Sequence, residues 1–223
     1  MPQSNREPSI RLFRSDFLES LTHVHPAVVP IVWCPVVAWF VWAGWHEAPA
    51  NMTAGRFTAA LVAGLFAWTL VEYVLHRFVF HFSPARPAPW LKHLVFLFHG
   101  IHHVQPWDKT RLVMPPAVSV PLAFLFYALF DWSLHRLAGP GWLEPVFAGF
   151  LSGYIAYDLL HYATHHLPMT TPAMKWLKRH HLLHHHATPD DRFGVTSPLW
   201  DLVFRTSPSD EHERQRGIGV GRD

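Results

Sequence analysis

The chain has 223 residues, of which half are hydrophobic and only 15% are charged, well below the roughly 25% of an average soluble domain. A net charge of +2 is too small to imply a nucleic-acid partner, and the single cysteine, Cys34, excludes a disulfide framework and a cysteine-based zinc module. The nineteen histidines outnumber the 18 lysines and arginines, and this excess requires an explanation.

The first 25 residues predict an extramembrane arm. Charged side chains precede any apolar run, so this segment does not have the pattern of a cleavable signal peptide. Several apolar residues within it predict an amphipathic helix at the membrane interface. They are Ile10, Leu12, Phe13, Phe17, Leu18 and Leu21.

Four apolar segments follow, each near the roughly 20 residues that a membrane-spanning helix needs. They are residues 26–45, 57–75, 112–130 and 142–157. Tryptophans at their ends are typical of membrane–water interfaces, which favours spans over buried helices of a soluble protein. The sequence predicts an all-α, polytopic membrane domain at residues 26–206, with about four transmembrane helices, and a polar tail at 207–223.

The distribution of lysine and arginine predicts the orientation of these spans. Sixteen of the 18 basic residues fall on the side that holds both termini, and only Arg56 and Arg136 fall on the other. By the positive-inside rule, we expect both termini to be cytoplasmic.

Most of the histidines lie in four clusters, all on the predicted cytoplasmic side. The clusters are His76 and His81; His99, His102 and His103; His161, His165 and His166; and His180, His181, His184, His185 and His186. The second and fourth clusters contain an i, i+3, i+4 pattern, so each is expected to aim several imidazoles at one point. The two histidines of the first cluster are five residues apart and meet only if the helix ends or bulges between them.

Imidazole-rich sets without thiolates suit iron, zinc, copper or nickel rather than calcium or magnesium. Ten to twelve histidine ligands are too many for one ion, and the clusters therefore predict a dinuclear site. A metal transporter is a weaker interpretation, because its ionisable ligands are expected along a path through the spans.

Four stretches of the chain resemble a known family. They are WTLVEYVLHRFVFH (68–81), FLFHGIHHVQPWDKTRLVMPP (96–116), GYIAYDLLHYATHH (153–166) and LKRHHLLHHHATPDDRFGVTSPLWDLVF (177–204). The resemblance is to the fatty acid hydroxylase / sterol desaturase superfamily. Within it, the HRFVFH form and the FGVTS-x-x-WD tail are more similar to the fatty acid 2-hydroxylases (sphingolipid α-hydroxylases) than to the sterol oxidases.

The resemblance implies a dimetal centre that holds two iron ions, which zinc is able to replace in purified protein. The ligands implied by position are His76, His81, His99, His102, His103, His161, His165, His181, His184 and His185. No catalytic residue beyond the metal ligands is implied. Candidates to orient the ligands are Glu72, Asp158, His166, His180 and Asp201, with plain salt bridges or surface positions as the alternative.

The reaction that the resemblance implies is O₂-dependent hydroxylation at C2 of a fatty acyl chain, either free, in ceramide or linked to another lipid. Nothing in the sequence resembles the cytochrome b5 domain of eukaryotic relatives, so we expect a separate electron donor of cytochrome b5 or ferredoxin type. The alternatives are a sterol or carotenoid oxidase or desaturase of the same superfamily, and a zinc-dependent membrane lipid hydrolase.

Two expectations concern the surroundings of the protein. Fourteen arginines against four lysines, and a C-terminus without an ER-retention signal, favour a bacterial inner membrane over the endoplasmic reticulum. Basic residues near the clusters are candidates to hold an anionic head group or redox partner. These residues are Arg77, Lys92, Lys109, Arg111, Lys175, Lys178 and Arg179.

Overall fold

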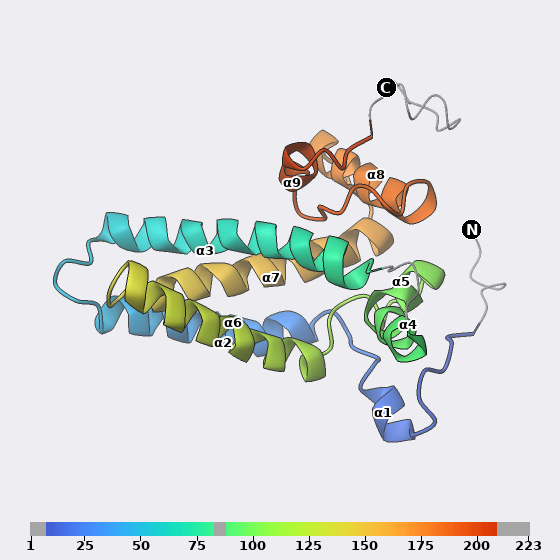
Figure 1. Ribbon diagram of the computed structural model, residues 1–223, viewed down its shortest axis with the longest axis horizontal. Coiled ribbons are helices and arrows are strands. Elements are labelled where there is room, and N and C mark those ends of the chain that lie inside the picture. Colours follow the sequence, from blue (N-terminus) through green and yellow to red (C-terminus); the bar gives the residue numbers. More distant parts are fainter. Residues whose placement is uncertain (1–7, 83–87, 209–223) are drawn as a thin grey trace.

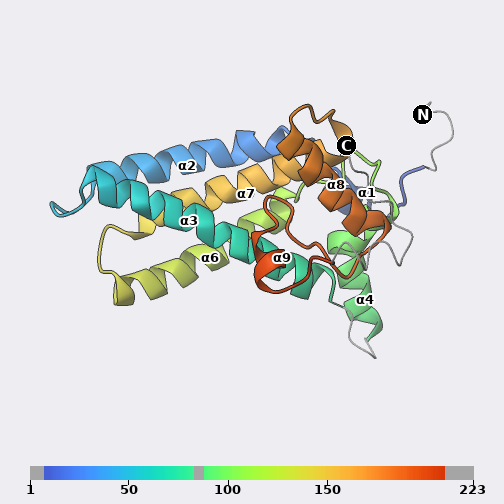
Figure 2. The ribbon, with the colours of Figure 1, turned by 90° about the horizontal axis from the view of Figure 1, so that it is seen from above.

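The computed structural model describes residues 8–82 and 88–208, and every regular element in these ranges is a helix. The long helices α2 (Val28–His46), α3 (Ala54–Leu75), α6 (Pro116–Leu137) and α7 (Leu143–His166) form a bundle (Figures 1 and 2). The shorter helices gather at one end of this bundle. They are α1 (Asp16–Ser20), α4 (Pro89–Val95), α5 (Ile101–Val104), α8 (Pro172–His186) and α9 (Leu199–Val203). The all-α prediction is confirmed, whereas the polar tail falls mostly outside the described residues.

Three of the long helices are long and apolar enough to cross a membrane, as expected of a multi-pass membrane protein: α2, α3 continued to Phe80, and α6. The segment before α6 was predicted to be part of a span, but Pro116 begins the helix because a proline disfavours helical geometry in the residue before it. Helix α7 has 24 residues but carries Glu144 and Asp158, and a fourth span stays a prediction.

Helix α7 is the central helix of the bundle, because it packs against α2, α3 and α6. Its aromatic side chains form the core with tryptophans of the neighbouring helices. The Tyr154 ring lies 5.7 Å from Trp33 of α2, and the Phe150 ring lies 5.1 Å from Trp68 of α3. Burial of these large rings stabilises the bundle around α7, whose side chains are largely buried.

The parallel helices α3 and α7 approach each other at backbone contact. A Cβ atom on Gly64 would lie 1.9 Å from the Val146 carbonyl oxygen, and one on Gly149 would lie 2.0 Å from that of Leu61. Small residues four apart, such as Gly149 and Gly153, allow membrane helices to pack this closely. The contact therefore fixes the axial position of α3 relative to α7.

The N-terminal arm, residues 8–25, crosses the segment at 105–111. The Ile10 amide donates to the Gln105 side chain at 2.9 Å, and the Val24 amide donates to the Thr110 carbonyl at 2.6 Å. The amphipathic helix predicted for this region covers only α1, because amide groups before Ser15 bond to side chains instead of helical carbonyls.

Glu19 is the main polar anchor of this arm. Its carboxylate accepts hydrogen bonds from the amides of Leu12 and Phe13, at 2.9 and 2.8 Å, and pairs with the buried Arg111. Burial alone would raise the pKa of Glu19, but the amides of Phe13 and Leu12 and the charge of Arg111 hold it below the ordinary 4.5. Arg111, predicted to face an anionic ligand, thus binds the arm.

The variant Gly149→Ala tests the contact between α3 and α7. The added methyl group has no space beside the Leu61 carbonyl, so we expect a loss of about 1–3 kcal/mol, measured as a lower thermal midpoint in detergent. Gly55→Ala is the control, because its Cβ would meet only the Thr53 hydroxyl at 4.0 Å. Equal midpoints for the two variants would contradict the close contact.

The variant Glu19→Ala tests the anchoring of the arm. It leaves Arg111 buried without its carboxylate partner and is expected to speed tryptic cleavage at Arg14 about tenfold at pH 8. The exposed Glu47→Ala serves as the control and is expected to leave the rate unchanged. Because the pKa of Glu19 is lowered on folding, its ionised carboxylate stabilises the wild-type arm fully above pH 4.5. This stabilisation is lost as the pH falls through the lowered pKa.

Candidate metal centre

Ten histidine side chains converge at the end of the bundle where the shorter helices lie, in two sets of five. The first histidine group consists of His76, His81, His99, His103 and His184, and the second of His102, His161, His165, His181 and His185. Within each group, one ring nitrogen from every member lies within 4.8 Å of the others. The structure thus brings together all ten side chains that the resemblance implied as ligands.

The two i, i+3, i+4 patterns do not each aim at one point, contrary to expectation. His99 and His103 belong to the first group, whereas His102 between them belongs to the second. In α8, His181 and His185 belong to the second group, and His184 between them belongs to the first. Viewed down a helix, the residue four positions after a given residue lies about 40° to one side of it. The residue three positions after it lies about 60° to the other side. Each helix therefore contributes to both groups.

Two π-helical turns adjust the directions of the remaining side chains. η2 (His76–Phe80) continues α3, and within it the His81 amide donates to the His76 carbonyl at 3.0 Å. This i→i+5 turn is the bulge that His76 and His81 require in order to meet. A second π-helical turn, η3 (Phe96–Gly100), contains His99, and such bulges are frequent at functional sites.

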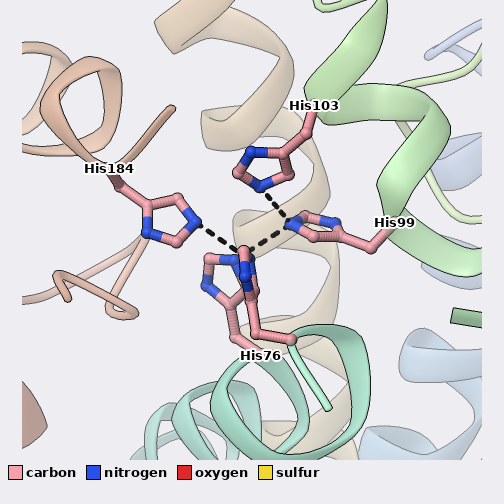
Figure 3. Close-up of side chains that lie close together, drawn as sticks. His76, His99, His103 and His184 are labelled. Atoms are coloured by element: carbon pink, nitrogen blue, oxygen red, sulfur yellow. Dashed lines mark hydrogen bonds between the residues drawn. The ribbon is translucent and has the colours of Figure 1, made fainter. Parts of the chain in front are cut away.

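In the first histidine group the Nε2 atoms point toward one another (Figure 3). His99 Nε2 lies 3.1 Å from His76 Nε2 and 2.9 Å from His103 Nε2, while His184 Nε2 lies 3.0 Å from His81 Nε2. One Nε2 atom carries at most one proton, so His99 cannot donate to both neighbours. Unprotonated nitrogens crowded in this way fit a shared cation.

The second histidine group repeats this arrangement. His102 Nε2 lies 3.0 Å from the Nε2 atoms of both His161 and His185. His181 Nε2 lies 2.9 Å from His165 Nε2 and 3.1 Å from His185 Nε2. Two nitrogens bound about 2.1 Å from one ion at a right angle lie about 3.0 Å apart, so the spacing fits metal ligation.

Hydrogen bonds at Nδ1 leave Nε2 free to act as a ligand. His76 Nδ1 donates to the Phe193 carbonyl at 2.5 Å, and His184 Nδ1 donates to the Asp191 carbonyl at 2.7 Å. A carbonyl oxygen only accepts, so the proton of each neutral ring is on Nδ1 and the Nε2 lone pair points into the group.

Burial keeps these rings in the neutral form that binds metals. It lowers the pKa of His81 to about 4 and, together with the nearby His81, that of His103 to about 3. The two groups adjoin each other, since the His103 and His185 rings are stacked with centroids 4.1 Å apart. The arrangement is therefore suited to two neighbouring cations.

Two buried carboxylates hold the 191–197 loop, which supplies the carbonyls that orient His76 and His184. Asp201 accepts from the amides of Phe193 and Gly194, both at 2.8 Å. Glu72 accepts from the amides of Val195 and Thr196, at 2.7 and 2.8 Å, and from the Thr196 hydroxyl at 2.5 Å. Both of these carboxylates therefore contact the backbone of the loop whose carbonyls bond to His76 and His184.

The other candidates to orient the ligands have different surroundings. Asp158 accepts from the Met114 amide at 3.2 Å, and His180 stacks on Trp176 with its Nε2 3.3 Å from Asp201. The His166 ring lies 4.9 Å from the ring of Tyr162. Arg77, one of the basic residues noted near the clusters, donates to the Tyr73 hydroxyl at 2.7 Å.

An apolar pocket of about 320 Å³ lies beside both histidine groups. His99, His102 and His161 line it, together with apolar side chains of the arm, of α4, η3 and α5, and of the segment before α6. The sequence did not predict that the N-terminal arm closes one wall of this pocket. The apolar residues noted in the arm were the signal that could have indicated this role.

Comparisons with known proteins agree with these features. Residues 61–206 match the model of the fatty acid hydroxylase family. The chain is 39% identical over 206 residues to a dihydroceramide fatty acyl 2-hydroxylase of Arabidopsis thaliana, covering 92% of this chain and 83% of the relative. It is 34% identical over 220 residues to the fatty acid 2-hydroxylase of Homo sapiens, covering 91% of this chain and 58% of that relative.

A further relative and a solved structure are also similar to this chain. The chain is 41% identical over 208 residues to the ceramide very long chain fatty acid hydroxylase of Saccharomyces cerevisiae, covering 92% of this chain and 51% of the relative. A structure of full-length scs7p, in which only the hydroxylase domain is visible, matches with a TM-score of 0.78 and 41% identity. The match covers 87% of this chain and 70% of that one.

The variant Asp201→Asn tests how the 191–197 loop is held. An amide nitrogen in place of one carboxylate oxygen would face a backbone N–H, and we expect a local loss of about 2 kcal/mol, or about 30-fold faster exchange of the Phe193 and Gly194 amides. Hydrogen exchange in detergent measures this, with the exposed Asp131→Asn as control. Unchanged protection of the two amides would show that Asp201 does not hold the loop.

Proposed function

The chain belongs to the fatty acid hydroxylase family, and from this premise we propose that it adds a hydroxyl group at C2 of a fatty acyl chain, using O₂ and two iron ions. The observation that carries the proposal is the position of the two histidine groups at the side of an apolar pocket. Hydroxylation of fatty acids makes the enzyme an oxidoreductase. The relatives named as 2-hydroxylases support C2 as the position.

Each histidine group would hold one metal ion through its Nε2 atoms. Iron is proposed over zinc because the poorly acidic C2–H bond is broken by redox chemistry, for which zinc is unsuited. When bound, the pair of ions supplies the electron transfer that activates O₂. Asp191 and Phe193 would fix the direction of two ligand rings through their carbonyls.

The proposed reaction balances with two external electrons. One atom of O₂ is inserted into the C2–H bond, and the other leaves as water after taking up two electrons and two protons. A separate donor of cytochrome b5 or ferredoxin type would supply the electrons. The acyl substrate would be a free fatty acid, a ceramide or another lipid-linked chain.

The protein's own contribution is to bind and orient the chain. The apolar pocket would hold the alkyl part of the substrate away from water and present C2 to the face lined by His99, His102 and His161. We further propose that the histidine end of the bundle is cytoplasmic, on the basis of the positive-inside rule. The excess of arginine over lysine supports a bacterial inner membrane as the host membrane.

Mass spectrometry of lipids from a host that expresses the chain tests the proposed function. Under ¹⁸O₂, we expect 2-hydroxy acyl lipids with one labelled oxygen, and a loss of more than 100-fold in His181→Ala, which lacks a group member. The exposed His93→Ala is the matched control and should keep the product.

The same experiment separates the alternatives. Hydroxylation at another carbon, or a new double bond, would move the assignment to another oxidase or desaturase of the superfamily. Label taken from H₂¹⁸O instead of ¹⁸O₂ would support a zinc-dependent hydrolase. Wild-type product that persists in His181→Ala would overturn the assignment of the second histidine group.

A further inference from the structure

The side chains that line the apolar pocket differ sharply in exposure. Ile101 and Val113, near the histidines in sequence or space, are only 4% and 3% exposed. Leu18 and Leu21 of the arm are 44% and 40% exposed, and Phe98 of η3 is 48% exposed. The pocket thus has a closed inner end and a mouth between the arm and the α4–η3 segment.

The rim of this mouth is apolar rather than polar. Leu94 of α4 lines the pocket and is 40% exposed, and Trp90, four residues earlier on the same helical face, is 65% exposed. Contiguous exposed apolar groups next to a pocket favour contact with lipid over contact with water. The mouth is therefore suited to an alkyl chain that comes from the bilayer.

Glu19 fixes the arm side of the mouth. It lies between Leu18 and Leu21 in the sequence, and its pairing with Arg111 ties the arm to the segment that continues into the pocket wall at Leu112. The two leucines are consequently held at the mouth by the pairing of Glu19 with the buried Arg111 as well as by apolar contact.

We propose that the acyl chain passes between the arm and the α4–η3 segment, and that Leu18 and Leu21 determine which chain lengths are accepted. The inference rests on the proposed function, because it takes C2 to lie at the inner end beside the histidines. Carbon atoms remote from C2 then lie toward the mouth. A volume of about 320 Å³ is near the lower limit for ligand pockets, so very long chains must extend past these leucines.

The variant Leu18→Trp tests this inference through chain-length selectivity. We expect kcat/KM for a twenty-four-carbon acid to fall about tenfold relative to that for a ten-carbon acid, in full-length protein reconstituted into vesicles with a chemical or enzymatic reductant. Phe17→Trp is the matched control, because Phe17 is 70% exposed and does not line the pocket. An equal fall for both acids, or the same selectivity change in Phe17→Trp, would overturn the proposal.

A thiol-protection measurement tests occupancy of the mouth without turnover. In a Cys34→Ser background, Leu18→Cys and Phe17→Cys each carry one cysteine for maleimide labelling. Saturating palmitic acid is expected to slow labelling of Leu18→Cys about tenfold and to leave Phe17→Cys unchanged.

The two measurements distinguish failure of this inference from failure of the proposed function. Absence of protection at Leu18→Cys overturns the inference even if the wild type hydroxylates at C2. Protection without any hydroxylated product supports the path of the chain and contradicts the proposed reaction.

Discussion

The backbone contact between α3 and α7 is the constraint on which the histidine arrangement depends. Gly64 and Gly149 meet the partner helix with no room for a Cβ atom, so the two parallel helices pack at backbone contact in one position along each other. His76 lies twelve residues beyond the first glycine, and His161 lies twelve residues beyond the second. At about 1.5 Å per residue, these histidines reach the same level, about 18 Å past the contact.

The other elements at this end of the bundle supply the remaining histidines of the two groups. Helices α5 and α8 each contribute histidines to both groups, so neither group forms without them. The 191–197 loop then fixes ring orientation on the first group through the carbonyls of Asp191 and Phe193. Buried carboxylates, which are costly in an apolar environment, are retained where they satisfy the amides of this loop.

The pocket is assembled from segments that are far apart in the chain. The N-terminal arm, the helices around η3 and the residues before α6 meet over one side of α7. An ion pair between Glu19 and Arg111 joins the first of these segments to the last. Tyr157, Asp158 and His161 of α7 complete the lining, so the wall that an alkyl chain would touch is shared between the bundle and these segments.

The sequence by itself indicated the long helices through their apolar runs and the histidine clusters through their spacing, whereas the choice of ten ligands among the clustered histidines came from the family resemblance. Apolar runs predicted the long helices, and the five-residue spacing of His76 and His81 required the bulge that η2 provides. Only the tertiary structure decided which histidine joins which group, that Glu72 holds a loop, and that the arm covers the pocket. These facts depend on which faces of distant helices pack together. Helical periodicity determines the direction of each side chain but not which residues of another helix it contacts.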